Sequence, residues 1–201
     1  MPRSAEQTER RILEAAYELF YRDGFTRVSV DNIAAGAGIT KRTLYHHFTS
    51  KDELLARTLE LQHKLALERI EAWAAELKGG LAALIDALFA EIERWARKPG
   101  WTGTGFTRVT MELADLPGHP ARQVARRHKA ALTSVYTRLL TECGVAQPAQ
   151  RADELIMLIE GAMVLSLIRG DTTPIIGAAA AAQRLMSPGI GISCQSQRAA
   201  T

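Results

Sequence analysis

The sequence has little cysteine and no long apolar run, and each scarcity excludes a class of protein. Its two cysteines, Cys143 and Cys194, lie far apart without a CxxC pairing, so they provide neither a disulfide framework nor a zinc-finger spacing. No stretch reaches the roughly 18 consecutive apolar residues that a membrane span needs. The N-terminal segment MPRSAEQTERR also lacks the apolar core of a signal peptide. We therefore expect a reducing, cytoplasmic location and no membrane partner.

Aromatic residues are also scarce, and this bears on the fold class. They make up 6% of the 201 residues, whereas alanine, leucine, glutamate and arginine are frequent. These four residue types favour helices, while sheets are enriched in β-branched and aromatic residues. The sequence therefore predicts an all-α fold, with 47% hydrophobic residues to fill the core of one ordinary domain or two small ones.

The motifs of several enzyme classes are missing. There is no phosphate-cradling glycine loop, no G-x-S-x-G elbow and no paired carboxylate motif. Glu112, His119 and His128 are residue types that bind divalent transition metals, but their spacing fits no fixed motif, and His119 with Pro120 is more typical of a turn before a helix. We expect a protein that is not an enzyme and that has no cofactor and no metal site.

Apolar periodicity, capping residues and glycine or proline breaks predict about nine helices. Thr8 is the expected N-cap of the first, and Ser50 to Glu53 reads as a capping box that opens a long fourth helix. The expected ranges are about 8–23, 29–38, 40–48, 50–77, 81–97, 104–116, 120–144, 149–169 and 172–186.

The helix pattern predicts two domains and a tail. Residues 1–55 form a three-helix unit, and the fourth helix joins it to a helical domain at 56–187. Residues 188–201 are rich in Gly, Ser and Gln without periodicity, so we expect this tail to be disordered.

The segment after Ser29 has the spacing of a helix-turn-helix. Ala34 lets two helices approach closely, Gly38 allows a left-handed turn, and Ile39 and Leu44 fill the space between the helices. The second helix of such a motif enters the major groove N-terminus first. The net charge of +3 is no argument for DNA binding, but the local charge is. Between positions 24 and 51 the sequence has four basic residues and one acidic residue, namely Arg27, Lys41, Arg42 and Lys51 against Asp31.

The candidate DNA contacts lie on the outer face of this second helix and at the helix starts around it. Tyr45 and His46 point away from the inner residues Leu44 and Phe48, although Tyr45 could also be an ordinary amphipathic core residue. The full set is Ser29, Thr40, Lys41, Arg42, Thr43, Tyr45, His46, His47 and Lys51.

Three of these residues have more specific expected roles. Arg42 can make a bidentate contact with guanine. Lys51, at the start of the fourth helix, can join the helix amides in binding a backbone phosphate. His47 can contact a phosphate or pack against the fourth helix, and both interpretations stay open.

The run GITKRTLYHHFTSK from Gly38 to Lys51 resembles the TetR family of transcriptional regulators. It shares that family's small-residue turn, Thr cap, Thr-Leu-Tyr run, aromatic residue and Ser-Lys pair, and the likeness covers about the first 55 residues. Two positions depart from the family pattern. The family usually has a larger residue at the position of Gly36 and a smaller one at the position of Arg42. The resemblance implies a homodimeric repressor that a small-molecule effector releases from double-stranded operator DNA, with a ligand pocket and a dimer interface in the C-terminal helices.

The resemblance assigns no individual residue beyond the first 55, so the C-terminal candidates come from residue type and periodicity. The expected dimer faces, which could instead be buried within a monomer, comprise Leu155, Leu158, Ile159, Ala162, Met163, Leu165, Leu167, Ile175, Ile176, Ala179, Ala182 and Leu185. The candidate pocket residues, each of which could equally be core, are Phe89, Trp95, Trp101, Phe106, Thr110, Met111, Glu112, His128 and Tyr136. The alternative functions are a ligand-independent architectural DNA-binding protein and, less favoured, an enzyme.

Overall fold

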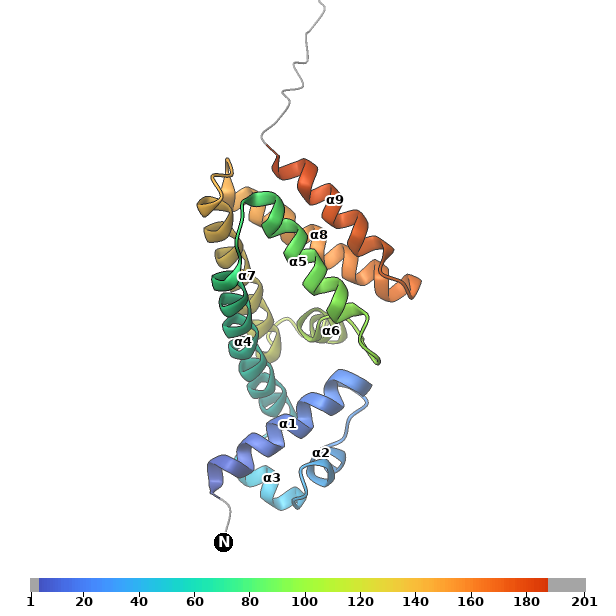
Figure 1. The fold of residues 1–201 in the computed structure, drawn as a ribbon. Helices are drawn as coiled ribbons and strands as arrows, with labels where there is room; N and C mark the ends of the chain where they lie inside the picture. The colour runs from blue at the N-terminus through green and yellow to red at the C-terminus, as the bar shows by residue number, and fades with distance from the viewer. Residues whose placement is uncertain (1–3, 188–201) are drawn as a thin grey trace, which may run out of the picture.

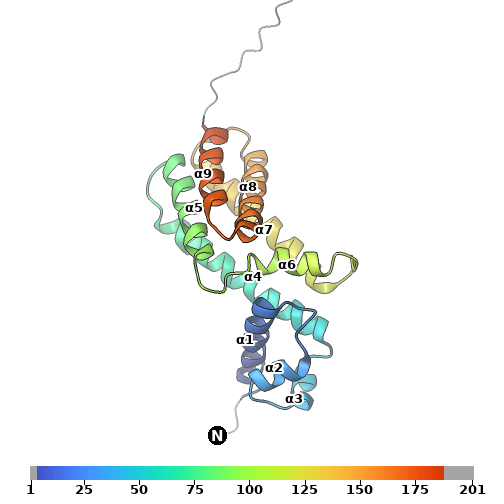
Figure 2. The same ribbon diagram turned by 90° about the vertical axis from the view of Figure 1, so that its right-hand side faces the viewer.

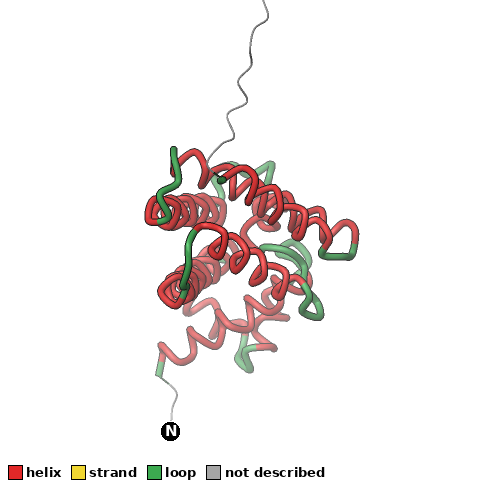
Figure 3. Tube along the Cα trace, turned by 45° about the horizontal axis from the view of Figure 1, so that its top comes forward, coloured by secondary structure: helices red, strands yellow, loops and turns green. Residues whose placement is uncertain are grey.

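The computed structural model describes residues 4–187, and within this range the chain forms nine α-helices and no strand (Figures 1 and 3). The all-α prediction is confirmed. The tail at 188–201, which we expected to be disordered, lies outside the described residues. The helices are α1 (Ala5–Asp23), α2 (Val30–Gly36), α3 (Lys41–His47), α4 (Lys51–Glu76), α5 (Leu81–Ala96), α6 (Gly105–Glu112), α7 (Pro120–Glu142), α8 (Pro148–Arg169) and α9 (Thr173–Met186).

Helix α1 begins earlier than predicted, because Ser4 and not Thr8 is its N-cap. The Ser4 hydroxyl accepts a hydrogen bond from the Gln7 backbone N–H at 3.2 Å, and the Gln7 side chain accepts one from the Ser4 N–H at 3.3 Å. This is a complete capping box. Thr8 lies inside the helix and donates its hydroxyl to the Ser4 carbonyl.

The capping box predicted at the start of α4 is only half formed. Ser50 caps the helix by accepting from the Glu53 N–H at 3.0 Å. The Glu53 carboxylate, however, accepts from the N–H of Thr49 at 2.7 Å instead of from that of Ser50. These hydrogen bonds to Thr49 lower the pKa of Glu53, so the carboxylate still stabilises this helix start, one residue further out than predicted.

The helices form two groups at opposite ends of an elongated molecule (Figures 1 and 2). Helices α1–α3 form one end, and α4 runs from this end alongside α7. Helices α5, α8 and α9 lie together at the other end, and α6 lies between the two ends in both views. Helix α6 is therefore placed to contact both ends.

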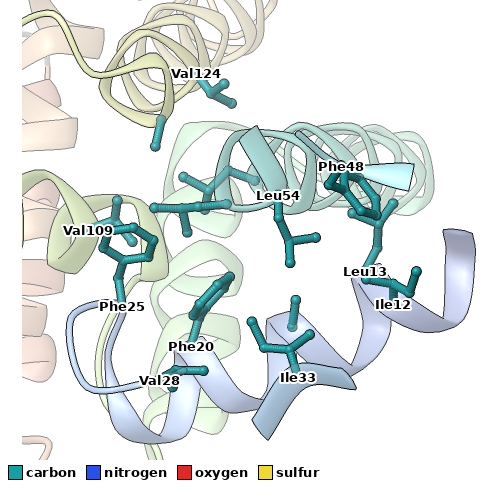
Figure 4. Close-up of a cluster of buried hydrophobic side chains, with 14 of the residues drawn as sticks. Ile12, Leu13, Phe20, Phe25, Val28, Ile33, Phe48, Leu54, Val109 and Val124 are labelled. Atoms are coloured by element: carbon teal, nitrogen blue, oxygen red, sulfur yellow. The ribbon is translucent and has the colours of Figure 1, made fainter. Parts of the chain in front are cut away.

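One buried hydrophobic cluster joins the N-terminal helices to α6 and α7. Ile12 of α1, Ile33 of α2 and Leu54 of α4 pack in it, and Figure 4 shows Val109 of α6 and Val124 of α7 in the same cluster. This packing couples α1–α4 to the helices that follow them in the chain. The division of the chain at residues 55 and 56 stays a prediction.

A second buried cluster joins α5, α7, α8 and α9, and it corrects the expected dimer faces. Six of the residues that we placed on those faces are buried inside the protomer: Leu155, Ile159, Ala162, Met163, Ile175 and Ala182. The apolar pattern of α8 has two sides, and one side packs against α7 and α9. The large apolar residues that α8 and α9 leave exposed are Met157, Leu165, Leu167, Ile168 and Ile176.

No helix within residues 4–187 is both long and apolar enough to span a bilayer.

Candidate nucleic-acid interface and ligand cavities

Helix α3 has a buried side and an exposed side, and the candidate DNA contacts lie on the exposed side. Leu44 is fully buried, while Tyr45 is 46% exposed. Lys41, Arg42 and His46 are also exposed. The next core position after Leu44 is Phe48, which is 1% exposed. The face opposite the core therefore presents two cationic side chains, a phenol and an imidazole to whatever the helix approaches.

The hydroxyl groups of Thr40 and Thr43 shape the start of α3. Thr40 is the N-cap, and its Oγ1 accepts from the Thr43 N–H at 3.1 Å. The two hydroxyl oxygens lie 2.9 Å apart in a hydrogen bond. Ser29 plays the corresponding part at α2, where its Oγ accepts from the Asn32 N–H at 3.1 Å. Capping thus accounts for both predicted residues Ser29 and Thr40, and any DNA contact by them stays a prediction.

Lys41 is paired within the motif, whereas Arg42 is not. The Lys41 ammonium lies 3.0 Å from a carboxylate oxygen of Asp31 on α2, and this hydrogen bond raises the pKa of Lys41. Arg42 has no ion pair among residues 4–187. Of the two cations, Arg42 has its guanidinium free for a base or a phosphate.

The ammonium of Lys51 packs against an aromatic ring. Its Nζ lies 4.2 Å from the centroid of the Phe25 ring, and partial burial lowers the pKa of Lys51. A cation in this position is attracted by the negative face of the ring. Lys51 therefore stabilises the junction between α4 and the loop after α1, and its expected contact with a phosphate stays a prediction.

His47 is half-buried at the end of α3. Its ring lies edge-on to that of His46, with centroids 5.9 Å apart, and is tilted against that of Phe48 at 6.4 Å. Both of its expected roles, phosphate contact and packing, stay open.

Arg11 of α1 holds the turn of the motif, and the sequence analysis missed it. Its guanidinium donates to the backbone carbonyl of Ala37, between α2 and α3. Gly38 follows in the left-handed conformation, with φ of 61°, and a Cβ there would lie 3.0 Å from the Arg11 guanidinium. An arginine on a helix gives no local sequence signal for a partner that lies 26 positions away.

The nine predicted pocket residues do not gather in one cavity. Met111 and Glu112 line a cavity between α6 and α8, whereas Phe106, Thr110 and Met111 line a groove against α7. Trp95 and Tyr136 line a cavity between α4 and α5, and Trp101 lines a further one near α9. Phe89 is buried in the second hydrophobic cluster, and His128 is stacked on the ring of Phe106.

The cavity between α6 and α8 has a volume of about 450 Å³. We call it the effector cavity because it is our candidate site for the expected small-molecule effector. Its walls combine apolar side chains with a few polar groups, as is usual for small-molecule sites. Glu160 at this cavity accepts a hydrogen bond from the Thr107 hydroxyl at 2.5 Å and forms an ion pair with Lys129. The lining residues are Thr102, Gly103, Thr104, Thr107, Arg108, Met111, Glu112, Glu160, Met163, Val164, Leu167 and Ile168.

Three residues that line the effector cavity also contact the end of the chain formed by α1–α3, which we predict to be the DNA-binding end. The guanidinium of Arg108 donates to the backbone carbonyl of Tyr21 at 2.7 Å, and the Thr102 hydroxyl donates to the same oxygen at 3.0 Å. Glu112 accepts from the backbone N–H of Thr26 at 3.1 Å. These contacts join α6 and the loop before it to the end of α1 and the loop that leads to α2.

The three residues considered for a metal site lie apart in separate environments. Glu112 is paired with Arg108, and His119 lies against the ring of Phe25. The Nδ1 atom of His128 lies 3.1 Å from Nδ1 of His63 on α4, and burial lowers the pKa of His128 to about 3. Across the described part of the chain, no group of three or more potential ligands from His, Cys, Asp and Glu is close enough to hold a metal ion.

Comparison with known protein sequences relates part of the chain to transcriptional regulators. Residues 12–58 match the family described as bacterial regulatory proteins, tetR family. The transcriptional regulator SrpR of Pseudomonas putida is 42% identical over 65 residues, and UidR of Escherichia coli K12 is 39% identical over 69 residues. These matches span 32% and 34% of this chain, but only 30% of SrpR and 35% of UidR.

Solved structures extend the likeness to almost the whole chain. Reduced NemR of Escherichia coli superposes with a TM-score of 0.81 over 92% of this chain and 100% of its own, at 19% identity, which shows a shared fold. A protein from Streptomyces avermitilis, assigned to the TetR transcriptional regulators, is 31% identical, with a TM-score of 0.73 over 88% of this chain and 98% of its own. The relatives are named as regulators and not as enzymes, in agreement with the sequence analysis. The chain thus belongs to the TetR family of DNA-binding transcriptional regulators.

Proposed function

We propose that this regulator is a homodimeric repressor that leaves its operator when a small molecule binds the effector cavity. The observation that carries this proposal is the double role of α6. One helix supplies Arg108 and Glu112 both to the wall of the cavity and to the contacts with α1 and the loop after it. A ligand that moves this wall also changes how the DNA-binding end is held.

DNA reading is assigned to the exposed face of α3. Arg42 and Tyr45 meet base edges, while Lys41 and Lys51 meet phosphates once DNA competes with their partners in the protein. One short recognition helix reads only a few base pairs, so a specific operator requires two of them on a palindrome. Dimerisation follows from this requirement.

The exposed apolar side of α8 and α9 supports a two-fold interface. Met157, Leu165 and Ile168 on α8 are 65%, 45% and 73% exposed, and Ile176 on α9 is 55% exposed. A run of large apolar side chains on one surface typically marks an interaction site. Small residues on the same sides, Gly161, Gly177 and Ala180, allow close helix approach when a second copy completes a four-helix arrangement.

Release from DNA follows from a change in the spacing of the two recognition helices. Helix α4 is rooted in the first hydrophobic cluster through Leu54, Leu55 and Leu59, and it continues alongside α7. A shift of α6 alters its contacts with α1 and tilts α4 as a rigid element. A coupling of about 1–3 kcal/mol would weaken operator binding by roughly 5- to 150-fold, and the operator would weaken ligand binding by the same factor.

Reciprocity provides the test. A ligand is first identified by the rise in melting temperature that it causes, and its affinity is then measured by calorimetry with and without operator DNA. We expect weaker ligand binding in the presence of operator. Val164→Phe narrows the effector cavity and should reduce ligand affinity while leaving ligand-free operator binding unchanged. A ligand affinity that is independent of operator would contradict release by an effector and favour an architectural DNA-binding role.

A further inference from the structure

The buried side chain of His119 connects the start of α7 with the loop between α1 and α2. His119 is the N-cap of α7, and its Nδ1 accepts a hydrogen bond from the Ala121 backbone N–H at 3.1 Å. The side chain is only 4% exposed. Its ring lies edge-on to that of Phe25, with the two centroids 5.8 Å apart. One residue thus both begins α7 and contacts the loop that leads to the helix-turn-helix.

The hydrogen bond from Ala121 also determines where a neutral His119 carries its proton. A nitrogen that accepts a hydrogen bond needs its lone pair, so the imidazole that accepts at Nδ1 has its N–H at Nε2. This Nε2 makes no hydrogen bond within residues 4–187, but a carboxylate oxygen of Asp52 lies 3.4 Å from it. Asp52 belongs to the first turn of α4. The buried N–H therefore attracts this carboxylate toward the start of α7.

Lys51, the residue before Asp52, lies against the same Phe25 ring. Its Nζ is 4.2 Å from the ring centroid, where the negative face of the ring attracts a cation. Phe25 is 7% exposed and also packs against Phe20, with ring centroids 5.5 Å apart. A ring packed on several sides keeps one orientation. The ammonium of a flexible side chain is thereby held at one place beside the start of α4.

The carboxylates that act on Lys51 have other partners. Burial lowers the pKa of Lys51, and the charges of Asp52 and Glu112 oppose this effect. Glu112 is paired with Arg108 at 3.2 Å, while Asp52 lies next to His119. Lys51 itself has no ion pair in the described part of the chain. Its ammonium has three N–H donors, so a phosphate can compete for some of them while another stays over the ring.

We propose that His119 is a positioning residue for DNA binding, which fixes the Phe25 ring beside the Lys51 ammonium and holds the Asp52 carboxylate away from the phosphate that Lys51 binds. This inference rests on the phosphate contact of Lys51 in the proposed function. An ordered lysine loses less conformational entropy when it binds, and a carboxylate turned toward the phosphate would repel it. DNA binding therefore depends on the start of α7, which lies outside the helix-turn-helix.

A double-mutant cycle between His119 and Lys51 on the full-length protein tests the inference. The probe is a mixed-sequence DNA duplex of about 30 base pairs, because a phosphate contact acts on every sequence. His119→Asn keeps a good N-cap for α7 but removes the ring beside Phe25. It should weaken DNA binding about two- to tenfold and lower the slope of log affinity against log salt toward that of Lys51→Ala. In the Lys51→Ala background it should have no further effect.

Two further variants separate positioning from stability. Val124→Ala removes buried methyl groups from α7 in the same hydrophobic cluster, and Figure 4 shows Val124 away from the Phe25 ring. It should lower the melting temperature but leave DNA binding by the folded protein unchanged. Phe25→Leu keeps an apolar side chain and removes the ring. It should weaken DNA binding as His119→Asn does, and again only when Lys51 is present.

The outcomes distinguish this inference from the proposed function. If Lys51→Ala lowers the salt slope while His119→Asn and Phe25→Leu keep the slope of the parent, the positioning role is overturned and the phosphate contact stands. An effect of His119→Asn that is equally large without Lys51 also overturns the positioning role. If Lys51→Ala itself keeps the slope of the parent, the proposed phosphate contact is wrong, and the inference falls with it.

Discussion

The guanidinium of Arg108 donates a hydrogen bond to the backbone carbonyl of Tyr21 at 2.7 Å. Tyr21 lies in the last turn of α1, where the backbone carbonyl groups have no N–H donor within the helix. The negative end of the helix dipole also attracts a cation there. The same arginine is paired with Glu112, which in turn accepts from Thr26. A single ion pair on α6 thus holds both the end of α1 and the loop that follows it.

Arg108→Ala should destabilise the protein and uncouple the effector from DNA. It removes the donor to Tyr21 and leaves the carboxylate of Glu112, which is 21% exposed, without its cation, so we expect a loss of about 1–3 kcal/mol in the free energy of unfolding. Urea denaturation measures this loss. In this variant, the ligand should also no longer weaken operator binding. Arg126→Ala, on the exposed side of α7, is the control and should change neither property.

Two glycines of the DNA-binding end should respond oppositely to alanine. Gly24 has φ of 86° and ψ of 158°, a region open almost only to glycine, and a Cβ there would lie 2.8 Å from Glu112 Oε1. Gly24→Ala should therefore cost about 1–3 kcal/mol. Gly36 ends α2, and its Cβ would meet Ala15 at an ordinary 3.6 Å, so Gly36→Ala should stabilise by about 0.4–1 kcal/mol. Thermal denaturation of both variants tests the pair, and a similar change in both would contradict the prediction.

Arg42→Ala and Lys51→Ala should affect DNA binding differently. Loss of an exposed arginine that reads a base should relax sequence preference and cost about 1–3 kcal/mol on the best operator. Loss of Lys51 should weaken binding to all sequences and reduce the slope of log affinity against log salt by about one. Titrations of operator and unrelated DNA at several salt concentrations distinguish the two. Lys64→Ala, exposed on α4, is the control for simple loss of charge.

Leu165→Glu should break the proposed dimer. It places a charge in the middle of the exposed apolar side of α8, where a second copy would bury it without a partner. Sedimentation at micromolar protein should show a dimer for the parent and a monomer for the variant. Leu65→Glu is the matched control, because Leu65 is similarly exposed, at 40%, but lies on α4. A parent protein that sediments as a monomer would remove the case for this interface.

His128 should make stability fall in acid. Burial, with contributions from Lys129 and His63, lowers its pKa from 6.5 to about 3, so the folded protein keeps this imidazole neutral while the unfolded chain protonates it. The resulting stabilisation is complete above pH 6.5 and is lost as the pH falls toward 3, at up to about 1.4 kcal/mol per pH unit. Denaturation at several pH values should show a shallower acid dependence for His128→Phe than for the parent. His46→Phe, on the exposed face of α3, should keep the parent's slope.

Much of the DNA-binding end could be predicted from the sequence because its decisive contacts are local. Ser29, Thr40 and Ser50 each cap a helix through a backbone N–H three positions later, and Gly38 provides the left-handed turn between α2 and α3. The error at the start of α1 was of the same local kind. Ser4 and Gln7 have the spacing of a capping box, whereas the sequence analysis places the N-cap at Thr8.

The sequence by itself determined the helices, the family's recognition motif and the polarity of each helix face, since these depend on contacts a few residues apart. Only the tertiary structure decided which side of α8 is buried, because an apolar stripe specifies burial without naming its partner. It also decided how the candidate pocket residues divide among separate cavities. The contact of Arg108 with Tyr21 spans 87 positions of the chain, and such a pairing exists only once packing has brought α6 against α1.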